Sequence, residues 1–164
     1  MMNDTGSFPS VAAVHASVLL LARAFAHGEV TRLRHAVADC AAAAGLTGAR
    51  LDDYVLAVNE LITNAVRHGG GQGRLRLWCA DQLLHCAVSD TGGGIATDRL
   101  DTRQRPDPDA CGGWGLWLAR QLTDEMVVES GPGGTTVRVS ARLGPPPGEG
   151  DDAGTVRESV AGTG

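Results

Sequence analysis

Hydrophobic positions along the chain change their spacing several times, and each change marks an element. Val18 to Phe25 is rich in apolar residues and predicts a strand. From Glu29 to Ala44 apolar residues recur every three or four positions, which predicts an amphipathic helix that ends before Gly45. The same period from Leu51 to His68 predicts a second helix, which ends in three glycines. Its expected buried stripe consists of Leu51, Val55, Val58, Ile62 and Val66.

The second half of the chain begins with a period of two, which is the period of strands. Alternating residues at 74–79 and 83–89 predict a hairpin. Gly113 to Asp124 predicts a third helix, and 126–130 and 135–143 predict a closing hairpin. The order is strand, helix, helix, two strands, loop, helix, two strands. This order predicts an α+β fold built as a layered sandwich.

Length and composition divide the chain into three parts. A chain of 164 residues fits one domain. Residues 1–15 are small and polar and are expected to form a flexible N-terminus, followed by one domain over 16–143. The segment 144–164 carries prolines, glycines and acids with little to bury, which predicts a disordered tail. Residues 96–112 are polar and contain Pro106 and Pro108, and they are expected to form a mobile loop.

Charge and composition exclude several functions. The net charge of -5 disfavours direct binding to nucleic acid. All 14 basic residues are arginines, so a phosphate site must use backbone N–H groups, Arg or a metal instead of the lysine of a P-loop. No run of 18 apolar residues predicts a membrane span. The four cysteines form no CxxC pair and are expected to be reduced thiols, which indicates the cytoplasm.

Candidate chemistry starts on the second helix. Glu60, Asn64 and His68 are spaced by four residues, so they lie along one face, beside the apolar stripe. A carboxylate and a carboxamide at the edge of a core suit Mg²⁺, which takes few protein ligands and completes its shell with water and phosphate. A solvated polar face explains the same spacing when it is considered alone.

Three glycine-rich segments follow in the sequence. Asp90-Thr91-Gly92-Gly93-Gly94 comes after a strand, where an Asp can accept a hydrogen bond while the backbone approaches a planar ring. Gly112-Gly113-Trp114-Gly115-Leu116 opens a helix, whose free N–H groups attract phosphate. Gly133-Gly134-Thr135-Thr136 enters the last strand and offers hydroxyls. Each segment alone is also consistent with a plain turn.

Taken in order, these pieces resemble the GHKL ATPase superfamily, which includes histidine-kinase catalytic domains, Hsp90, gyrase B and MutL. The segment 60–68 resembles the N box, 90–94 the G1 box and 113–116 the G2 box. The phrases from Ala57 to Gly69 and from Gly113 to Leu122, and the ending Gly-Thr-Thr-Val-Arg-Val, are typical of anti-sigma-factor serine kinases of actinobacterial type. The resemblance spans roughly residues 28–140. It implies a mixed, mostly antiparallel sheet with helices on one face.

The resemblance also implies ATP and Mg²⁺ as cofactors and a role for each candidate residue. Asn64 would ligate Mg²⁺ between the phosphates, and Glu60 would act as general base on an incoming hydroxyl. Asp90 would bind the adenine amino group, and the residues that shape or complete the pocket would be Gly92, Gly94, Thr135 and Thr136. The phosphates would face Gly113, Gly115 and Leu116 under a lid formed by 96–112. His68 is a further candidate in the pocket, although the helix dipole alone also favours a histidine at this C-terminus. The chain departs from the family at Trp114, where a small or basic residue is usual.

Three functions are compared. The first is an ATP-dependent serine/threonine kinase that regulates a sigma factor through an antagonist protein, with pairing of two copies through the first elements. The second is a nucleotide-binding interaction module without kinase activity. The third is a histidine-kinase-like domain, which needs a phosphoacceptor histidine; His35 on the first helix lacks the expected acidic follower.

Overall fold

The computed structural model describes residues 16–95, 102–110 and 112–144. The flexible N-terminus predicted for 1–15 and the disordered tail predicted beyond Gly144 lie outside the described residues. So do 96–101 and Cys111 of the predicted lid. Within the described parts, every element predicted from the hydrophobic pattern is present, with boundaries that differ by no more than a few residues.

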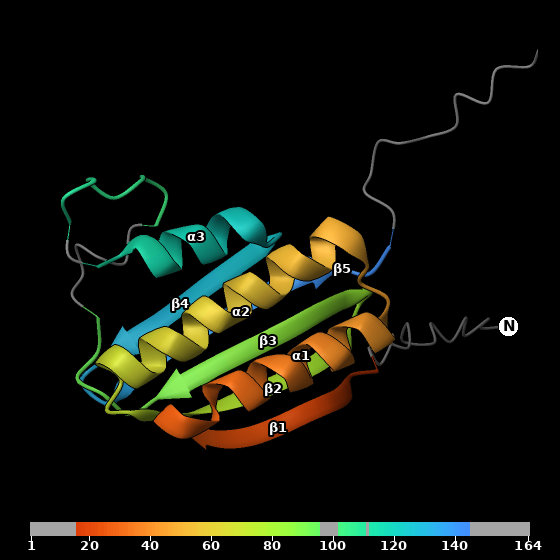
Figure 1. Ribbon diagram of the computed structural model, residues 1–164, viewed down its shortest axis with the longest axis horizontal. Coiled ribbons are helices and arrows are strands. Elements are labelled where there is room, and N and C mark those ends of the chain that lie inside the picture. The colour runs from red at the N-terminus through yellow and green to blue at the C-terminus, as the bar shows by residue number, and fades with distance from the viewer. Residues whose placement is uncertain (1–15, 96–101, 111, 145–164) are drawn as a thin grey trace, which may run out of the picture.

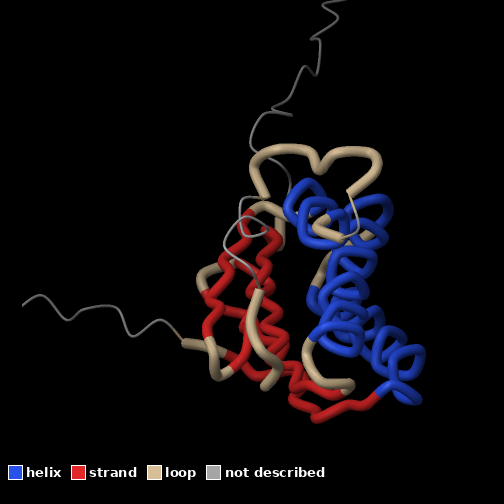
Figure 2. The backbone as a smooth tube through the Cα atoms, turned by 90° about the vertical axis from the view of Figure 1, so that its left-hand side faces the viewer, coloured by secondary structure: helices blue, strands red, loops and turns tan. Residues whose placement is uncertain are grey.

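The elements are arranged as one sheet and one layer of helices (Figures 1 and 2). The strands run antiparallel at all four pairings, in the order β1-β2-β3-β5-β4, so the described sheet is antiparallel throughout and contains no parallel pair. The helices lie together on one face of this sheet, which confirms the predicted two-layer α+β sandwich. The bounds are β1 Val18–Ala26, η1 His27–Glu29, α1 Val30–Ala44, α2 Gly48–His68, β2 Gln72–Ala80, β3 Leu83–Asp90, α3 Trp114–Leu122, β4 Glu125–Gly131 and β5 Gly134–Arg142.

The turns have the residues that their geometry requires. Gly45 follows α1 with φ of 116°, in the left-handed region that glycine adopts without strain, and its N–H caps the helix on carbonyls of α1. The β2–β3 hairpin turns at Asp81 and Gln82, which have φ of 53° and 61°. Two consecutive positive φ values are the geometry of a tight two-residue hairpin, and this turn fixes the register in which Ala80 pairs with Leu83.

The core lies between the sheet and α2, which runs through the middle of the helical layer (Figure 1). The predicted stripe of α2 is partly wrong. Val58 and Ile62 are buried, but Leu51, Val55 and Val66 are only half-buried. The face is rotated because α2 packs against the sheet and also against α1 and α3, and its buried residues are Tyr54, Ala57, Val58, Leu61, Ile62 and Ala65.

The described part of the chain contains three cysteines. Cys40, Cys79 and Cys86 are free thiols, and burial raises the pKa of Cys79 and of Cys86. These two thiols therefore stay protonated and unreactive at neutral pH.

In the described parts of the chain, no helix combines the length and apolar character that a bilayer crossing requires.

Candidate functional site

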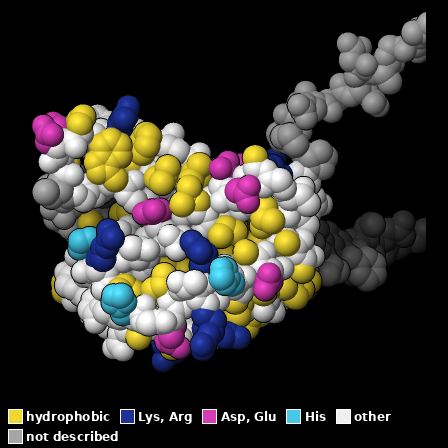
Figure 3. All heavy atoms as spheres, viewed as in Figure 1, with side chains coloured by type: hydrophobic (Ala, Val, Ile, Leu, Met, Phe, Trp, Pro, Cys, Tyr) yellow, Lys and Arg dark blue, Asp and Glu magenta, His cyan; other side chains and the backbone are white. Residues whose placement is uncertain are grey.

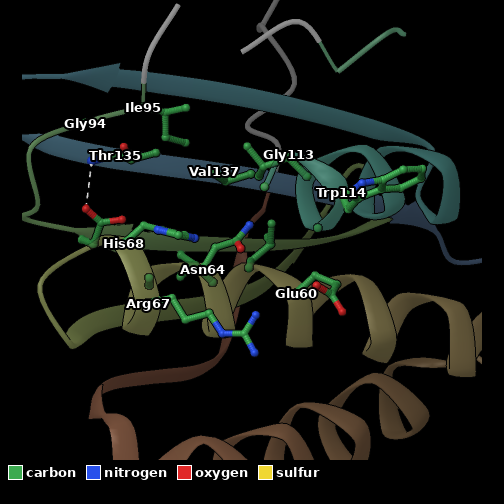
Figure 4. Close-up of a pocket in the computed structure, with 17 residues that line it drawn as sticks. Glu60, Asn64, Arg67, His68, Gly94, Ile95, Gly113, Trp114, Thr135 and Val137 are labelled. Carbon is green, nitrogen blue, oxygen red and sulfur yellow. Dashed lines mark hydrogen bonds between the residues drawn. The ribbon is translucent and has the colours of Figure 1, made fainter. Parts of the chain in front are cut away.

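A cavity of about 670 Å³ opens between α2, the start of α3 and the ends of β3 and β5. Figure 4 shows its lining, and in the space-filling view the surface is hollowed beside α3, with apolar side chains on the rim (Figure 3). The cavity brings together segments that are distant in the sequence. Its lining consists of Glu60, Leu61, Asn64, Ala65, Arg67, His68, Val88, Asp90, Gly94, Ile95, Gly112, Gly113, Trp114, Gly115, Leu116, Thr135 and Val137.

One wall of the cavity is the polar face of α2. Glu60, Asn64 and His68 project from successive turns of the helix and all line the cavity (Figure 4). Glu60 and Asn64 are half-buried at the edge of the core, whereas His68 is exposed at the C-terminus of the helix. The spacing of four residues therefore places a carboxylate, a carboxamide and an imidazole on one surface, as the sequence predicts.

The start of α3 lies directly against this wall. A Cβ atom placed on Gly115 would be 2.9 Å from Oε2 of Glu60 and 3.1 Å from Nδ2 of Asn64, so any larger residue would have to displace these two side chains. The helix begins after Gly113, which has φ of 86° and gives no side-chain cap. The first N–H groups of α3 have no partner within the helix and lie beside Asn64. Such a helix start attracts anionic groups such as phosphate.

The opposite end of the cavity is built around Asp90, the last residue of β3. Its Oδ1 accepts hydrogen bonds from the N–H of Gly92 at 2.9 Å and of Thr135 at 3.3 Å, the second of which is drawn in Figure 4. Gly69 packs against this carboxylate so closely that an added Cβ would be 2.5 Å from Cβ of Asp90. Among the described residues no hydrogen bond uses Oδ2 of Asp90, so this oxygen is available to a ligand.

The loop after β3 is fixed to the last hairpin. Gly94 has φ of 85°, and a Cβ atom there would be 2.5 Å from the carbonyl oxygen of Gly131. Ser130 Oγ accepts a hydrogen bond from the N–H of Ile95 at 2.7 Å and also contacts Oγ1 of Thr135 at 2.8 Å. These bonds hold the glycine-rich loop in place at the mouth of the cavity.

Two of the predicted site residues lie outside the lining. Gly92 packs against α2's end, where an added Cβ would be 2.7 Å from Cα of Gly69, so it supports the cavity from behind. Thr136 points to the other face of the sheet, where its Oγ1 is 2.9 Å from Oγ of Ser89. Strand alternation explains the difference, because Thr135 and Thr136 are neighbours and only one of them can face the helices.

Several lining residues were not singled out by the sequence. Val88 and Val137 lie two residues from Asp90 and Thr135 on the same strands, so the period of two could have identified them. Arg67 lines the cavity three residues after Asn64, which is a helical spacing. No sequence pattern could have identified Ile95, because its place in the cavity depends on the hydrogen bond of its N–H to Ser130, which is 35 residues away in the sequence.

The described part of the predicted lid, residues 102–110, packs on α3. Thr102 is buried, and its Oγ1 accepts a hydrogen bond from Nη1 of Arg120 at 3.1 Å. The guanidinium of Arg105 lies 5.4 Å from the ring centre of Trp114 and 5.9 Å from that of Trp117. The two rings meet edge to face at 5.8 Å. Trp114, at the position where the sequence departs from the family, therefore lines the cavity and also contacts the segment that is predicted to form a lid.

Comparison with known proteins identifies the family. The model of the histidine kinase-like ATPase domain matches residues 24–141, which is most of the chain, and the chain belongs to this family. This family is part of the GHKL superfamily that the motifs indicate. A search of the curated proteins finds no match.

Solved structures agree with the fold. The chain is similar to the histidine kinase domain of the Erythrobacter litoralis EL346 blue-light-activated histidine kinase, with a TM-score of 0.50 and 22% identity over 68% of this chain and 65% of that one. It is similar to the RsbU and RsbW domains of Rv1364c from Mycobacterium tuberculosis, with a TM-score of 0.54 and 22% identity over 75% of this chain and 32% of that one. It is also similar to the mycobacterial sensor histidine kinase MprB, with a TM-score of 0.50 and 19% identity over 79% of this chain and 97% of that one. The chain thus spans less than two thirds of the first two structures, and at these identities the likeness is one of fold.

The cavity is suited to Mg²⁺ only in combination with a phosphate ligand. In the described part of the chain no group of three or more His, Cys, Asp or Glu side chains could hold a metal by itself. Asn64 offers one amide oxygen, and the carboxylate of Glu60 lies beside it. Mg²⁺ commonly binds through one or two protein oxygens together with water and substrate phosphates, so this donor set fits the ion.

Proposed function

We propose that the chain binds ATP with Mg²⁺ in this cavity and transfers the γ-phosphoryl group to a serine or threonine of an antagonist protein, thereby regulating a sigma factor. The observation that carries the proposal is the polar cluster of Glu60, Asn64 and the glycine start of α3 at one end of a cavity that has Asp90 at its other end. Membership of the ATPase family supports nucleotide binding. The phrases typical of anti-sigma-factor kinases, and the likeness to a chain that contains an RsbW domain, support the finer assignment.

The adenine end is assigned to Asp90. Because two backbone N–H groups hold Oδ1, the carboxylate is already oriented before a ligand enters. Its Oδ2 then accepts a hydrogen bond from an exocyclic amino group, and Thr135 assists through water. Val88 and Val137 supply the apolar walls that a planar ring requires.

The phosphate end is assigned to the junction of α2 and α3. The N–H groups at the start of α3, from Gly115 and Leu116, face the phosphates, with Gly113 permitting the turn. Asn64 would hold the Mg²⁺ ion, which would neutralise part of the phosphate charge when it is bound. His68, the last residue of α2, lines the same cavity and would be a further contact for the nucleotide.

Phosphoryl transfer needs little covalent work by the protein. The hydroxyl oxygen of the partner attacks the γ-phosphorus, the bond from that phosphorus to the β–γ bridging oxygen breaks, and ADP leaves. The proton of the hydroxyl passes to the carboxylate of Glu60. The remaining contribution is positioning, which the C-terminal half of α2 and the start of α3 provide.

The proposed setting is cytoplasmic, with a protein partner and no direct contact with nucleic acid or membrane. A homodimer through the first elements is part of this proposal, and Val18 and Leu19 of β1 are exposed at 56% and 54%. Light scattering at high concentration tests the dimer, and a monodisperse monomer would remove it.

The experiment uses ATP labelled at the γ-phosphate and candidate antagonist proteins that carry an exposed serine. Glu60→Gln should abolish transfer while ATP still binds, because the variant keeps the shape of the side chain and removes the base. Asp53→Asn, an exposed acid on the same helix, is the matched control and should transfer normally. Transfer that survives in Glu60→Gln would exclude Glu60 as the base.

One observation favours a second candidate, a nucleotide-binding interaction module without transfer. The carboxylate of Glu60 packs against Gly115 in this structure, whereas a base needs an open side toward the incoming hydroxyl. This module would bind ATP with the same dependence on Asn64 and Asp90 and would transfer no label to any partner.

A further inference from the structure

The face of the sheet opposite the helices has no described element over it (Figure 2). Alternation along the strands assigns its residues, because the buried leucines and valines of β2, β3 and β5 face the helices. Three rows then cross the open face. In strand order they are Ala24-Arg74-Ser89-Thr136-Glu129, Ala22-Arg76-Ala87-Arg138-Val127 and Leu19-Trp78-His85-Ser140-Glu125.

Three arginines gather in the first two rows, in a chain whose net charge is -5. Arg74, Arg76 and Arg138 are all exposed, and we call them the arginine face. Arg76 and Arg138 stand on either side of the small residue Ala87, about 10 Å apart at the usual strand spacing. No ion pair within the described residues involves any of the three. Glu129 and Glu125 stand at the β4 edge of these rows, so the positive charge is concentrated on β2 and β5, where a bound anion would reduce the mutual repulsion of the three arginines.

The third row holds one border of the arginine face in place. Trp78 stacks on His85 at 5.1 Å with an interplanar angle of 15°, and Nδ1 of His85 is 2.7 Å from Oγ of Ser140. The guanidinium of Arg76 lies 5.8 Å from the ring centre of Trp78. This contact favours one position of the Arg76 guanidinium, so less side-chain entropy is lost when an anion binds.

The acids that could fill this face occur in the chain itself. Between 145 and 164 there are four acidic residues and one arginine, and three of the acids are Glu149, Asp151 and Asp152. This segment begins next to Gly144, whose carbonyl accepts a hydrogen bond of 2.7 Å from Nη1 of Arg50 and is thereby fixed at the end of β5.

The length of chain is sufficient for the acids to return to the arginine face. Arg138 lies six residues before Gly144, a distance of about 20 Å along a strand. Asp151 and Asp152 follow Gly144 by seven and eight residues, which span up to about 25 Å when extended. The tether also raises the effective concentration of the acids at the face, so that a few surface charge contacts suffice.

We propose that the acidic stretch 149–152 docks on the arginine face and covers the open side of the sheet. The proposal is independent of the nucleotide site, which is on the other side of the sheet. Docking that rests on exposed charges is sensitive to salt, because added ions screen such contacts.

The test is nuclear magnetic resonance of the full chain labelled with ¹⁵N. At low salt the amides of 149–152 should show higher heteronuclear NOE values than those of 159–163. Arg76→Ser/Arg138→Ser should abolish the difference, and so should raising NaCl from about 50 mM to about 500 mM. The control Arg32→Ser/Arg34→Ser removes the same charge from exposed positions of α1 and should leave the difference unchanged.

A second variant changes only the segment and leaves the described fold intact. Asp151→Asn/Asp152→Asn should shift the amide signals of Ala87 and Ser89 in the centre of the face, whereas Glu158→Gln should not. NOE values in the acidic stretch that are equal in the wild type and in Arg76→Ser/Arg138→Ser would overturn the proposal. It would also be overturned if the Ala87 and Ser89 signals depended on protein concentration but not on Asp151 and Asp152, because the occupant would then be a second copy.

Discussion

Gly115 is the second residue of α3, and its Cα faces the two polar side chains of α2 that we assign to the phosphate end. Replacing it by alanine adds one methyl group 2.9 Å from Oε2 of Glu60 and 3.1 Å from Nδ2 of Asn64. Ordinary contact begins at 3.4 Å, so the carboxylate oxygen must move by about 0.5 Å. Both neighbouring groups are ends of side chains that can rotate, and the backbone of α3 can therefore remain in place.

This geometry predicts little change in stability but a clear loss of binding. Alanine favours a helix over glycine by about 0.5–1 kcal/mol, which offsets the small strain of moving two side chains. The melting temperature of Gly115→Ala should therefore stay within about 5 °C of the wild type. Affinity for ATP with Mg²⁺ should fall by about tenfold or more, because the added methyl group displaces Asn64, which we assign to the ion, and changes around a metal ligand typically lower metal affinity by about 10- to 100-fold.

The assay combines thermal unfolding with calorimetric titration of ATP and Mg²⁺. Gly28→Ala is the matched control, since a Cβ atom at Gly28 meets nothing within 4 Å, and it should bind as the wild type does. Unchanged affinity in Gly115→Ala would refute the assignment of Glu60 and Asn64 to the phosphate end. A large fall in the melting temperature would show that the start of α3 packs against rigid atoms instead of side-chain ends.

The remaining predictions concern the adenine end, the core and the sheet. Gly69→Ala places a methyl group against both Asp90 and the carbonyl of Ala65; it should destabilise the fold by about 1–3 kcal/mol in urea titrations and weaken ATP binding. Ile62→Ala, in the fully buried centre of α2, should lower the free energy of unfolding by about 2–5 kcal/mol, whereas Leu56→Ala, at a side chain 43% exposed, should change it by no more than about 0.5 kcal/mol. Burial lowers the pKa of His85, so below its ordinary value of 6.5 the unfolded chain binds a proton more readily than the folded one. The stabilisation that comes from keeping His85 neutral is present above pH 6.5 and is lost as the pH falls through the lowered pKa. Urea midpoints measured at several pH values should therefore depend less on acid in His85→Gln than in the wild type. The same dependence in both proteins would contradict a lowered pKa of His85.

The fold could be predicted well because local patterns and tertiary structure agree. Two residues at Asp81 and Gln82 separate strands with a period of two, and the turn they form is the one that such a hairpin needs. The buried face of α2 could not be placed as well. Tyr54 is fully buried and donates a hydrogen bond of 3.3 Å to the carbonyl of Leu84. The predicted stripe omits it, although it lies four residues before Val58, because the buried face is rotated toward Ala57 and Leu61.

The order of the motifs in the sequence was sufficient to select the candidate site residues. Which of these residues line the same cavity depends on how the helices pack on the sheet. Glu60, Asn64 and His68 follow from helical spacing alone. The close approach of Gly69 to Asp90 depends on how the end of α2 meets the end of β3, and no local pattern encodes it. The separation of Thr135 from Thr136 required the pairing of β5 with β3, which determines the face on which each hydroxyl lies.

The central claim is that this cavity binds ATP with Mg²⁺, and calorimetric titration of the purified chain beside Asn64→Ala and Asp90→Asn tests it most directly. We predict saturable binding by the wild type that weakens in both variants, since each variant removes one end of the site. Absence of binding by the wild type, or binding that neither variant changes, would contradict the claim.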